Sequence, residues 1–310
     1  RPTSPRAPVP RSTAWSRLAG SADPSPDAGL SDVTADADRV AQLALAEDGG
    51  LDVTSDVTVA RGAAGFGAIE FRSGGVLAGC AYADAVARKA GLALGWRALE
   101  GHSVPAGDVV GTLEGPVAAM LRAERPLLNL LQRACGIATT TRALVEAVAG
   151  TPCRILHTRK TAPGLRGLDV RAVLAGGGAP HRTDLARVMM VKDNHWRALA
   201  RQGMTLAAAL AAARARGVTV CHVEVESIEQ VEAACAVGAT RMLVDNQPPE
   251  TVRHWALAAR RLAPGIEVEA TGGVTLANVR AYALAGADFV SVGALTHSVH
   301  AADLALELQL

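Results

Sequence analysis

The sequence has few aromatic residues, few cysteines, no long apolar run and no excess of charge of either sign. Phe, Trp and Tyr together make up 3% of the chain, so Ala, Val and Leu have to fill most of any core. The formal net charge is +1, which gives no global electrostatic attraction to nucleic acid or to a membrane surface. Any anion-binding site must therefore come from a local cluster of Arg and Lys.

The cysteines also lack a pattern. Without CxxC spacing they are typical of reduced, mostly buried thiols rather than of a disulfide framework or a zinc site. They are Cys80, Cys135, Cys153, Cys221 and Cys235. No apolar run reaches the roughly 18 residues of a membrane span. We expect a cytoplasmic protein that binds neither membranes nor nucleic acid.

Residues 1–30 are rich in Pro, Ser, Ala and Arg and show almost no periodicity. A signal peptide needs an apolar stretch that this segment lacks. A segment of this composition buries too little apolar surface to fold, so we predict a disordered extension over residues 1–30.

What is present is enough apolar sequence for two domains. Hydrophobic residues make up 49% of 310 residues, enough for one barrel of about 200 residues and a smaller companion. Gly-rich turns separate short strand-like segments between residues 57 and 113, so residues 31–150 are predicted to form an N-terminal α+β domain with linker helices. The helices expected there span residues 35–47, 82–90, 117–132 and 137–149, the last two separated by a turn at residues 134–136.

Over residues 151–297 the rhythm changes to short apolar runs that alternate with helices. The runs span residues 154–158, 188–192, 218–226, 241–245, 266–271 and 289–293, and the helices 205–216, 227–237, 249–262 and 275–285. Ser227 and Thr275 are candidate N-caps. Repeated βα units predict an α/β fold, a complete or incomplete TIM-like β/α barrel. We expect a C-terminal helix over residues 298–310.

Charged and Gly-rich segments follow every predicted barrel strand at its carboxyl end, which is where barrel enzymes place their active sites. They are Arg159-Lys160, Lys192, Glu224 with Glu226, Asp245, Thr271-Gly272-Gly273 and Gly293. Two ends are cationic, two anionic and two Gly-rich. A substrate with carboxylates, a hydroxylated sugar and a phosphate requires this combination.

Two glycine clusters are ambiguous. The segment 271–275 lets backbone N–H groups approach a phosphate at the start of the helix expected from Thr275, or is simply a tight turn. The run 176–178 is either a flexible loop that carries His181 and Arg182 to the site or an ordinary connection between a helix and a strand.

Several segments resemble the quinolinate phosphoribosyltransferase (NadC) family, in the order in which that family has them. They are TRKTAPGLR (158–166), GGGAPHR (176–182), VKDNH (191–195), VEVES (223–227), LVDN (243–246), EATGG (269–273) and VGALTHS (292–298). Upstream, AERPLLNLLQRACGIAT (123–139) resembles the linker helix of the same family. The likeness covers about residues 37–310.

The resemblance implies a type II phosphoribosyltransferase, a pentosyltransferase. Such an enzyme transfers phosphoribosyl from phosphoribosyl pyrophosphate (PRPP) to quinolinate with decarboxylation, giving nicotinate mononucleotide, pyrophosphate and CO2 in NAD biosynthesis. It implies Mg2+ bound with PRPP, and a homodimer or higher oligomer whose active sites are shared between subunits.

The resemblance also implies the roles of individual residues. The quinolinate pocket would contain Arg159, His181, Arg182 and Lys192, with Arg125 entering from the partner subunit. The PRPP and phosphate site would contain Lys160, Glu224, Asp245, Thr271, Gly272, Gly273, Gly293 and His297. Of these, Lys160, Glu224 and Asp245 are the candidate catalytic residues, and Glu224 and Asp245 the candidate Mg2+ ligands. His195 is expected to support the site from behind.

Several positions depart from the family pattern, mostly around residues 169–187. His157 stands where Asp is common, Val170-Arg171 where Lys-Tyr is common, and Pro180 where Asn or Ser is common. Thr271 replaces a Ser and keeps the hydroxyl.

These departures leave a second activity open, that of a related phosphoribosyltransferase acting on another small aromatic acid, as in the molybdenum-transport-associated (ModD-like) branch. A non-catalytic relative would be expected to lack Lys160, Glu224 or Asp245, and all three are present.

Overall fold

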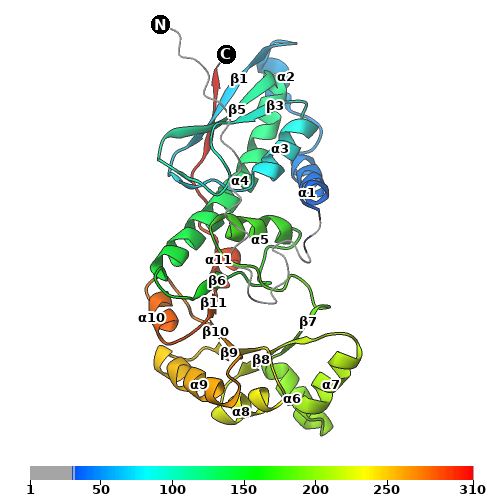
Figure 1. Ribbon diagram of the computed structural model, residues 1–310. Helices are drawn as coiled ribbons and strands as arrows, with labels where there is room; N and C mark the ends of the chain where they lie inside the picture. The colour runs from blue at the N-terminus through cyan, green and yellow to red at the C-terminus, as the bar shows by residue number, and fades with distance from the viewer. Residues whose placement is uncertain (1–29, 31, 310) are drawn as a thin grey trace.

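The computed structural model describes residue 30 and residues 32–309. The predicted extension over residues 1–30 lies, apart from Leu30, outside the described residues. Within them, no helix is both long and apolar enough to cross a membrane. Figure 1 shows two parts joined by the long helix α4, with the antiparallel sheet in the upper part and the parallel sheet below.

The upper part is an α+β domain, as predicted. Its antiparallel sheet has the strand order β12-β1-β5-β3, and a short β2-β4 pair lies beside it. The strands are β1 (Ala64–Phe71), β2 (Gly75–Val76), β3 (Ala93–Trp96), β4 (Ser103–Val104), β5 (Asp108–Pro116) and β12 (Ala305–Gln309). The helices are α1 (Val33–Glu47), α2 (Val53–Thr58), α3 (Cys80–Lys89) and α4 (Val117–Ala147).

The predicted C-terminal helix is wrong, because residues 305–309 form strand β12. This strand pairs antiparallel with β1, and Leu306 stands opposite Ile69 in the register. Leu306 is buried while Glu307 is exposed, which is the alternation of a strand with one face on the core. The chain thus returns from the barrel to complete the first domain (Figure 1).

The predicted break between two linker helices is also wrong, since α4 continues unbroken through Gly136. A Cβ built on Gly136 would stand 2.1 Å from the carbonyl oxygen of His300. The glycine is therefore required by the close approach of the 300–302 backbone, not by a turn. The backbone N–H of Ala302 donates to the carbonyl oxygen of Gln132 nearby.

The lower part is the predicted β/α barrel, open on one side. Its parallel sheet has the order β6-β11-β10-β9-β8-β7, and no ladder among the described residues joins β6 to β7. The strands are β6 (Arg154–Leu156), β7 (Val188–Val191), β8 (Val220–Val225), β9 (Arg241–Asp245), β10 (Glu267–Thr271) and β11 (Phe289–Ser291). Each coincides with an apolar run identified in the sequence.

The barrel helices α6 to α9 lie on the outer side of these strands (Figure 1). The helices are α5 (Arg166–Ala175), α6 (Asp193–Gln202), α7 (Leu206–Ala215), α8 (Ile228–Ala236), α9 (Pro249–Leu262), α10 (Val279–Leu284) and α11 (Ala294–His297). Ser227 caps α8 through its side chain, as predicted. The Thr275 cap is wrong: α10 begins later, and the Thr275 N–H donates to the side chain of Asn278.

The run 176–178 is a packed connection rather than a flexible loop. Gly176 ends α5, and its ideal Cβ would lie 2.5 Å from the carbonyl oxygen of Ala138 on α4. Gly178 would meet the side chain of Val173 at 2.6 Å. Both glycines therefore let α5 and the following segment lie against α4. This packing fixes the position of the segment that follows, which contains His181 and Arg182.

Candidate functional site

A cavity of about 870 Å³ lies at the carboxyl ends of the barrel strands. Every site residue predicted from the sequence lines it, with the exception of Arg125. These residues are Arg159, Lys160, His181, Arg182, Lys192, Glu224, Asp245, Thr271, Gly272, Gly273, Gly293 and His297. The parallel strands bring together side chains up to 138 positions apart in the chain, because their carboxyl ends meet at one edge.

One side of the cavity is cationic and contains two neighbouring guanidinium groups. Burial lowers the pKa of Arg182, and the positive charge of Arg159 lowers it further. The Arg159 Nε atom is buried and has no hydrogen-bond partner among the described residues. Two adjacent guanidinium groups, one with an unused buried donor, repel each other until an anion lies between them.

His181 lines the same side, but both of its ring nitrogens are engaged by protein groups. Nδ1 accepts the backbone N–H of Arg182 at 2.7 Å, and Nε2 lies 3.3 Å from Oε2 of Glu269. The ring therefore donates through Nε2 and accepts through Nδ1 in this arrangement. His157 accepts the backbone N–H of His181 through Nε2 at 2.9 Å.

Glu269 lies on β10 and lines the cavity, although its side chain is buried. Burial opposes its ionisation, yet His181, Arg241 and Ser291 together hold the pKa of Glu269 well below its usual range. Neither Glu269 nor Arg241 was predicted from the sequence as a site residue. Glu269 stands two residues before Thr271, so the period of two along the strand places it on the same inward face, which was the available signal.

The other side of the cavity is acidic. Glu224 forms an ion pair with the Lys192 ammonium and accepts the backbone N–H of Asp193 at 3.3 Å. Burial and the negative charge of Glu224 raise the pKa of Asp245. Among the described residues no group of three or more His, Cys, Asp or Glu forms a metal site.

Three glycines, Gly272, Gly273 and Gly293, shape part of the cavity wall. A Cβ on Gly293 would stand 2.9 Å from Cδ of Lys160 and 3.2 Å from the ring of His297. Gly293 therefore lets these two basic side chains approach one another. Gly272 and Gly273 both have positive φ, 82° and 61°, in the turn after β10.

His195 supports the site as expected. Its Nδ1 accepts the backbone N–H of Lys192 at 3.0 Å, and this bond forms part of the cap of α6. The indole of Trp196 donates to the carbonyl oxygen of Glu224 at 2.8 Å. These two aromatic side chains hold the main chain around the Lys192–Glu224 pair.

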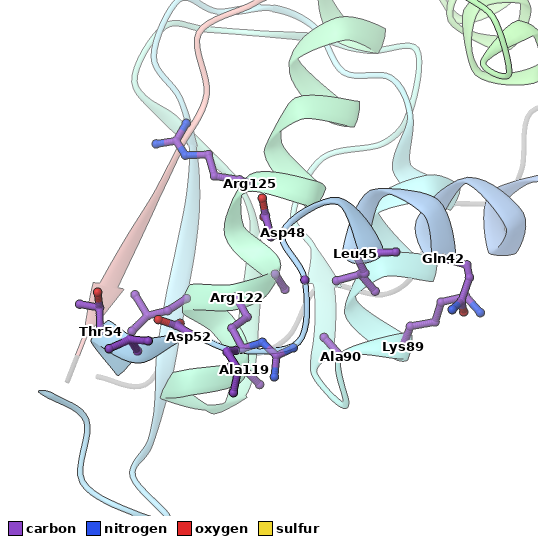
Figure 2. A pocket seen from close by; sticks show the side chains of 16 residues that line it. Gln42, Leu45, Asp48, Asp52, Thr54, Lys89, Ala90, Ala119, Arg122 and Arg125 are labelled. Carbon is purple, nitrogen blue, oxygen red and sulfur yellow. The ribbon is translucent and has the colours of Figure 1, made fainter. Parts of the chain in front are cut away.

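Arg125 lies on α4 in the N-terminal domain, outside the barrel cavity. It is exposed and 3.3 Å from Glu124. It borders a second cavity, of about 750 Å³, lined by residues of α1, α2, α3 and α4 (Figure 2). In Figure 2 the Arg125 side chain extends away from the other labelled side chains, whereas Arg122 lies among them. One chain alone therefore does not bring Arg125 to the barrel cavity.

Two family models match the chain. The model described as "Quinolinate phosphoribosyl transferase, N-terminal domain" matches residues 52–135. The model described as "Quinolinate phosphoribosyl transferase, C-terminal domain" matches residues 137–307. The junction of the two models falls within α4, and the second match includes β12, which returns to the first domain.

Two curated relatives and one solved structure have the name nicotinate-nucleotide pyrophosphorylase. The nicotinate-nucleotide pyrophosphorylase (carboxylating) of Mycobacterium leprae is 40% identical over 90% of this chain and all of its own length. A probable enzyme of the same name from Bacillus subtilis is 44% identical over 68% of this chain and 71% of its own. The structure of the nicotinate-nucleotide pyrophosphorylase from Francisella tularensis is similar with a TM-score of 0.82 and 30% identity, covering 89% of this chain and 97% of the other.

Proposed function

The chain belongs to the quinolinate phosphoribosyltransferase family, and we propose on that premise that it converts quinolinate and PRPP into nicotinate mononucleotide. The pyridine nitrogen attacks the anomeric carbon of the sugar and pyrophosphate leaves. Loss of the 2-carboxylate then releases CO2, a step of NAD biosynthesis. The observation that carries this proposal is the pair of adjacent guanidinium groups of Arg159 and Arg182 in the barrel cavity.

The cationic side suits a ring with two neighbouring carboxylates. Guanidinium groups bind carboxylates in a bidentate manner, and each charge-assisted bond contributes about 1.5 to 3 kcal/mol. Arg159 and Arg182 supply the two guanidinium groups. Lys192 supplies a third cation once its ammonium group leaves Glu224 and binds the ligand. Because a carboxylate held too tightly leaves slowly, these groups hold the surviving 3-carboxylate more tightly than the 2-carboxylate.

The acidic side suits the sugar. Glu224 and Asp245 place two carboxyl groups near each other, where they bind ribose hydroxyls and stabilise positive charge that develops on the ring. The pyridine nitrogen has its own lone pair, so no general base is required. Catalysis then comes from orientation of the two substrates and from the electrostatic field of the cavity.

The part of the cavity that contains the three glycines suits a phosphate group of PRPP. Thr271, Gly272, Gly273 and Gly293 line this part with Lys160 and His297. Turns with positive φ expose backbone N–H groups to an anion, and the two basic side chains add charge. Lys160 accordingly contacts either the pyrophosphate, whose departure it then assists, or the 5-phosphate, which stays on the sugar.

Mg2+ is the cofactor that this donor set fits. Mg2+ is commonly held by one or two carboxylates together with substrate phosphates, rather than by a cage of protein ligands. Glu224 and Asp245 provide two such carboxylates beside the phosphate end of the cavity. When bound with PRPP, the ion neutralises charge on the leaving pyrophosphate.

A homodimer, alone or within a larger oligomer, would bring Arg125 of one subunit to the barrel cavity of the other. Two observations support this proposal: Arg125 lies outside the cavity of its own chain, and large apolar side chains near it are exposed. These are Leu43, Leu51 and Val53. Clustered exposed apolar residues mark interaction surfaces.

The cytoplasm remains the proposed location. All five cysteines are free and buried, which suits a reducing compartment. Nothing among the relatives reported above favours the activity of the molybdenum-associated branch.

Kinetics of Arg182→Ala test the proposal. We expect the KM for quinolinate to rise at least tenfold, or turnover to vanish, because one charge-assisted pair is lost. The matched control is Arg187→Ala, since Arg187 is exposed on the same segment and pairs only loosely with Asp184, at 3.6 Å. Unchanged quinolinate kinetics in Arg182→Ala would reject the pocket assignment.

A further inference from the structure

A charged network extends from the wall of the cavity to the start of β9, in a barrel interior that branched apolar side chains normally fill. It begins at Arg241, near the start of β9, which is buried to 3% exposure. The guanidinium group contacts Glu267 at 2.8 Å and Glu269 at 3.3 Å, and its carbon lies 3.8 Å from the ring centroid of Phe289. Arg241 is therefore held in place from several directions.

Glu269 connects this arginine to the substrate side of the barrel. Its Oε2 lies 3.3 Å from Arg241 Nη1 and 3.3 Å from His181 Nε2. The side chain is 1% exposed, so a carboxylate without both partners would be an uncompensated buried charge. Glu269 thus fixes which nitrogen of His181 carries the proton and how the ring is turned.

The network ends on the main chain of Arg182. With its proton on Nε2, the His181 ring has a lone pair on Nδ1, and that lone pair accepts the Arg182 backbone N–H at 2.7 Å. The orientation of the His181 ring therefore determines where the Arg182 peptide lies. Arg182 is one of the two guanidinium groups in the cationic side of the cavity.

We propose that Arg241, Glu269 and His181 form a relay of positioning residues that orients Arg182 for the aromatic diacid. This inference rests on the proposed function of the cavity. In this relay His181 contributes to recognition through the Arg182 backbone, not as a cation in contact with the substrate. A purely structural role would instead affect both substrates, or only stability.

Glu269→Gln tests the relay, because it keeps the shape of the side chain and removes the charge. We expect the KM for quinolinate to rise about tenfold, the effect of losing one hydrogen bond to a charged group, with the KM for PRPP unchanged. Glu267→Gln is the matched control, since Glu267 also contacts Arg241 from β10 but does not contact His181. Its quinolinate KM should equal that of the wild type.

Double variants separate positioning from simple destabilisation. If Glu269 acts through Arg182, Glu269→Gln adds no further increase to the quinolinate KM in an Arg182→Ala background. Additive effects, or equal increases in the two KM values, would overturn the relay. Where turnover in the Arg182→Ala background is too low for a KM, calorimetric titration with quinolinate gives the same comparison.

Variants of His181 keep the proposal testable if Glu269→Gln does not fold. His181→Asn retains an acceptor for the Arg182 N–H, whereas His181→Leu retains none, so Asn should preserve more quinolinate affinity than Leu. Equal affinities would overturn the relay. Absence of wild-type turnover and of quinolinate binding would instead refute the proposed function. Wild-type turnover with Glu269→Gln identical to Glu267→Gln would refute the relay alone.

Discussion

The side chain of Asn246 occupies the space in which a Cβ of Gly272 would stand. An ideal Cβ on Gly272 would lie 2.2 Å from Asn246 Oδ1 and 2.8 Å from its backbone nitrogen. Asn246 itself has a φ of 52°, which non-glycine residues rarely adopt, and its amide donates to Asp245. Through Asn246, the turn at Gly272 and Gly273 and the Asp245 carboxylate at the end of β9 therefore depend on each other for their positions.

Gly272→Ala should therefore disrupt both neighbours. We expect a loss of about 2 kcal/mol or more in the free energy of unfolding, from the positive φ and the clash together, and a large loss of activity. Denaturant titration measures the free energy of unfolding. Gly273→Ala is the control, since Gly273 also has positive φ but no atom lies within 4 Å of its ideal Cβ. Equal destabilisation by both variants would contradict this explanation.

Gly293→Ala should act on one substrate. The new methyl group displaces Lys160 and His297, both flexible enough for the fold to survive. We expect the KM for PRPP to rise severalfold while the KM for quinolinate stays unchanged. Steady-state kinetics with each substrate varied in turn measure this, and an effect on quinolinate alone would place the phosphate elsewhere.

Acid should destabilise the protein through His157. Burial, with a smaller contribution from His181, lowers the pKa of His157 from 6.5 to about 4. The unfolded chain therefore binds a proton that the folded chain excludes, so this contribution to stability is complete above pH 6.5 and declines as pH falls toward 4. At 1.36 kcal/mol per pKa unit, the loss is about 3 kcal/mol.

The measurement for His157 is the slope of unfolding free energy against pH, not its absolute value. His157→Asn should flatten the slope between pH 6.5 and 4, the two pKa values that define the window. The exposed His254 provides a control variant, His254→Asn, with the wild-type slope. The buried His222, whose pKa burial lowers to about 3, leaves a residual slope in both. An unchanged slope in His157→Asn would contradict the prediction.

Mixing two inactive variants tests the shared site. If Arg125 acts on the partner's barrel, dimers formed between Arg125→Ala and Arg182→Ala subunits contain one intact site in two. With free exchange of subunits, activity should recover to roughly a quarter of the wild type. No recovery after confirmed exchange would show that Arg125 does not act across the interface.

The strands, and most of the residues that line the cavity, were predictable from the sequence because they follow local patterns. The apolar runs and their flanking charges predicted the first and last residues of β9 and α9 correctly. Twelve of the thirteen predicted site residues line one cavity. The unbroken α4 was not predictable, because the reason for Gly136 is a contact with His300, distant in the chain.

The network of Arg241, Glu269 and His181 was not predictable for the same physical reason. The three residues are separated in the sequence, since Arg241 lies in β9, Glu269 in β10 and His181 in a loop. In the sequence, each alone resembles any other ionisable residue. Only the register of the parallel strands puts them together. The strand β12, by contrast, carried a visible alternation of Leu306 with Glu307 and was predictable.

The most direct test of the whole account is a single reaction with the purified protein. Quinolinate labelled in its 2-carboxylate is supplied with PRPP and Mg2+, and CO2 and nicotinate mononucleotide are quantified together. We expect CO2 and nicotinate mononucleotide in equal amounts, and in Lys192→Ala either no turnover or a raised KM for quinolinate. Consumption of PRPP with another aromatic acid, but not with quinolinate, would contradict it.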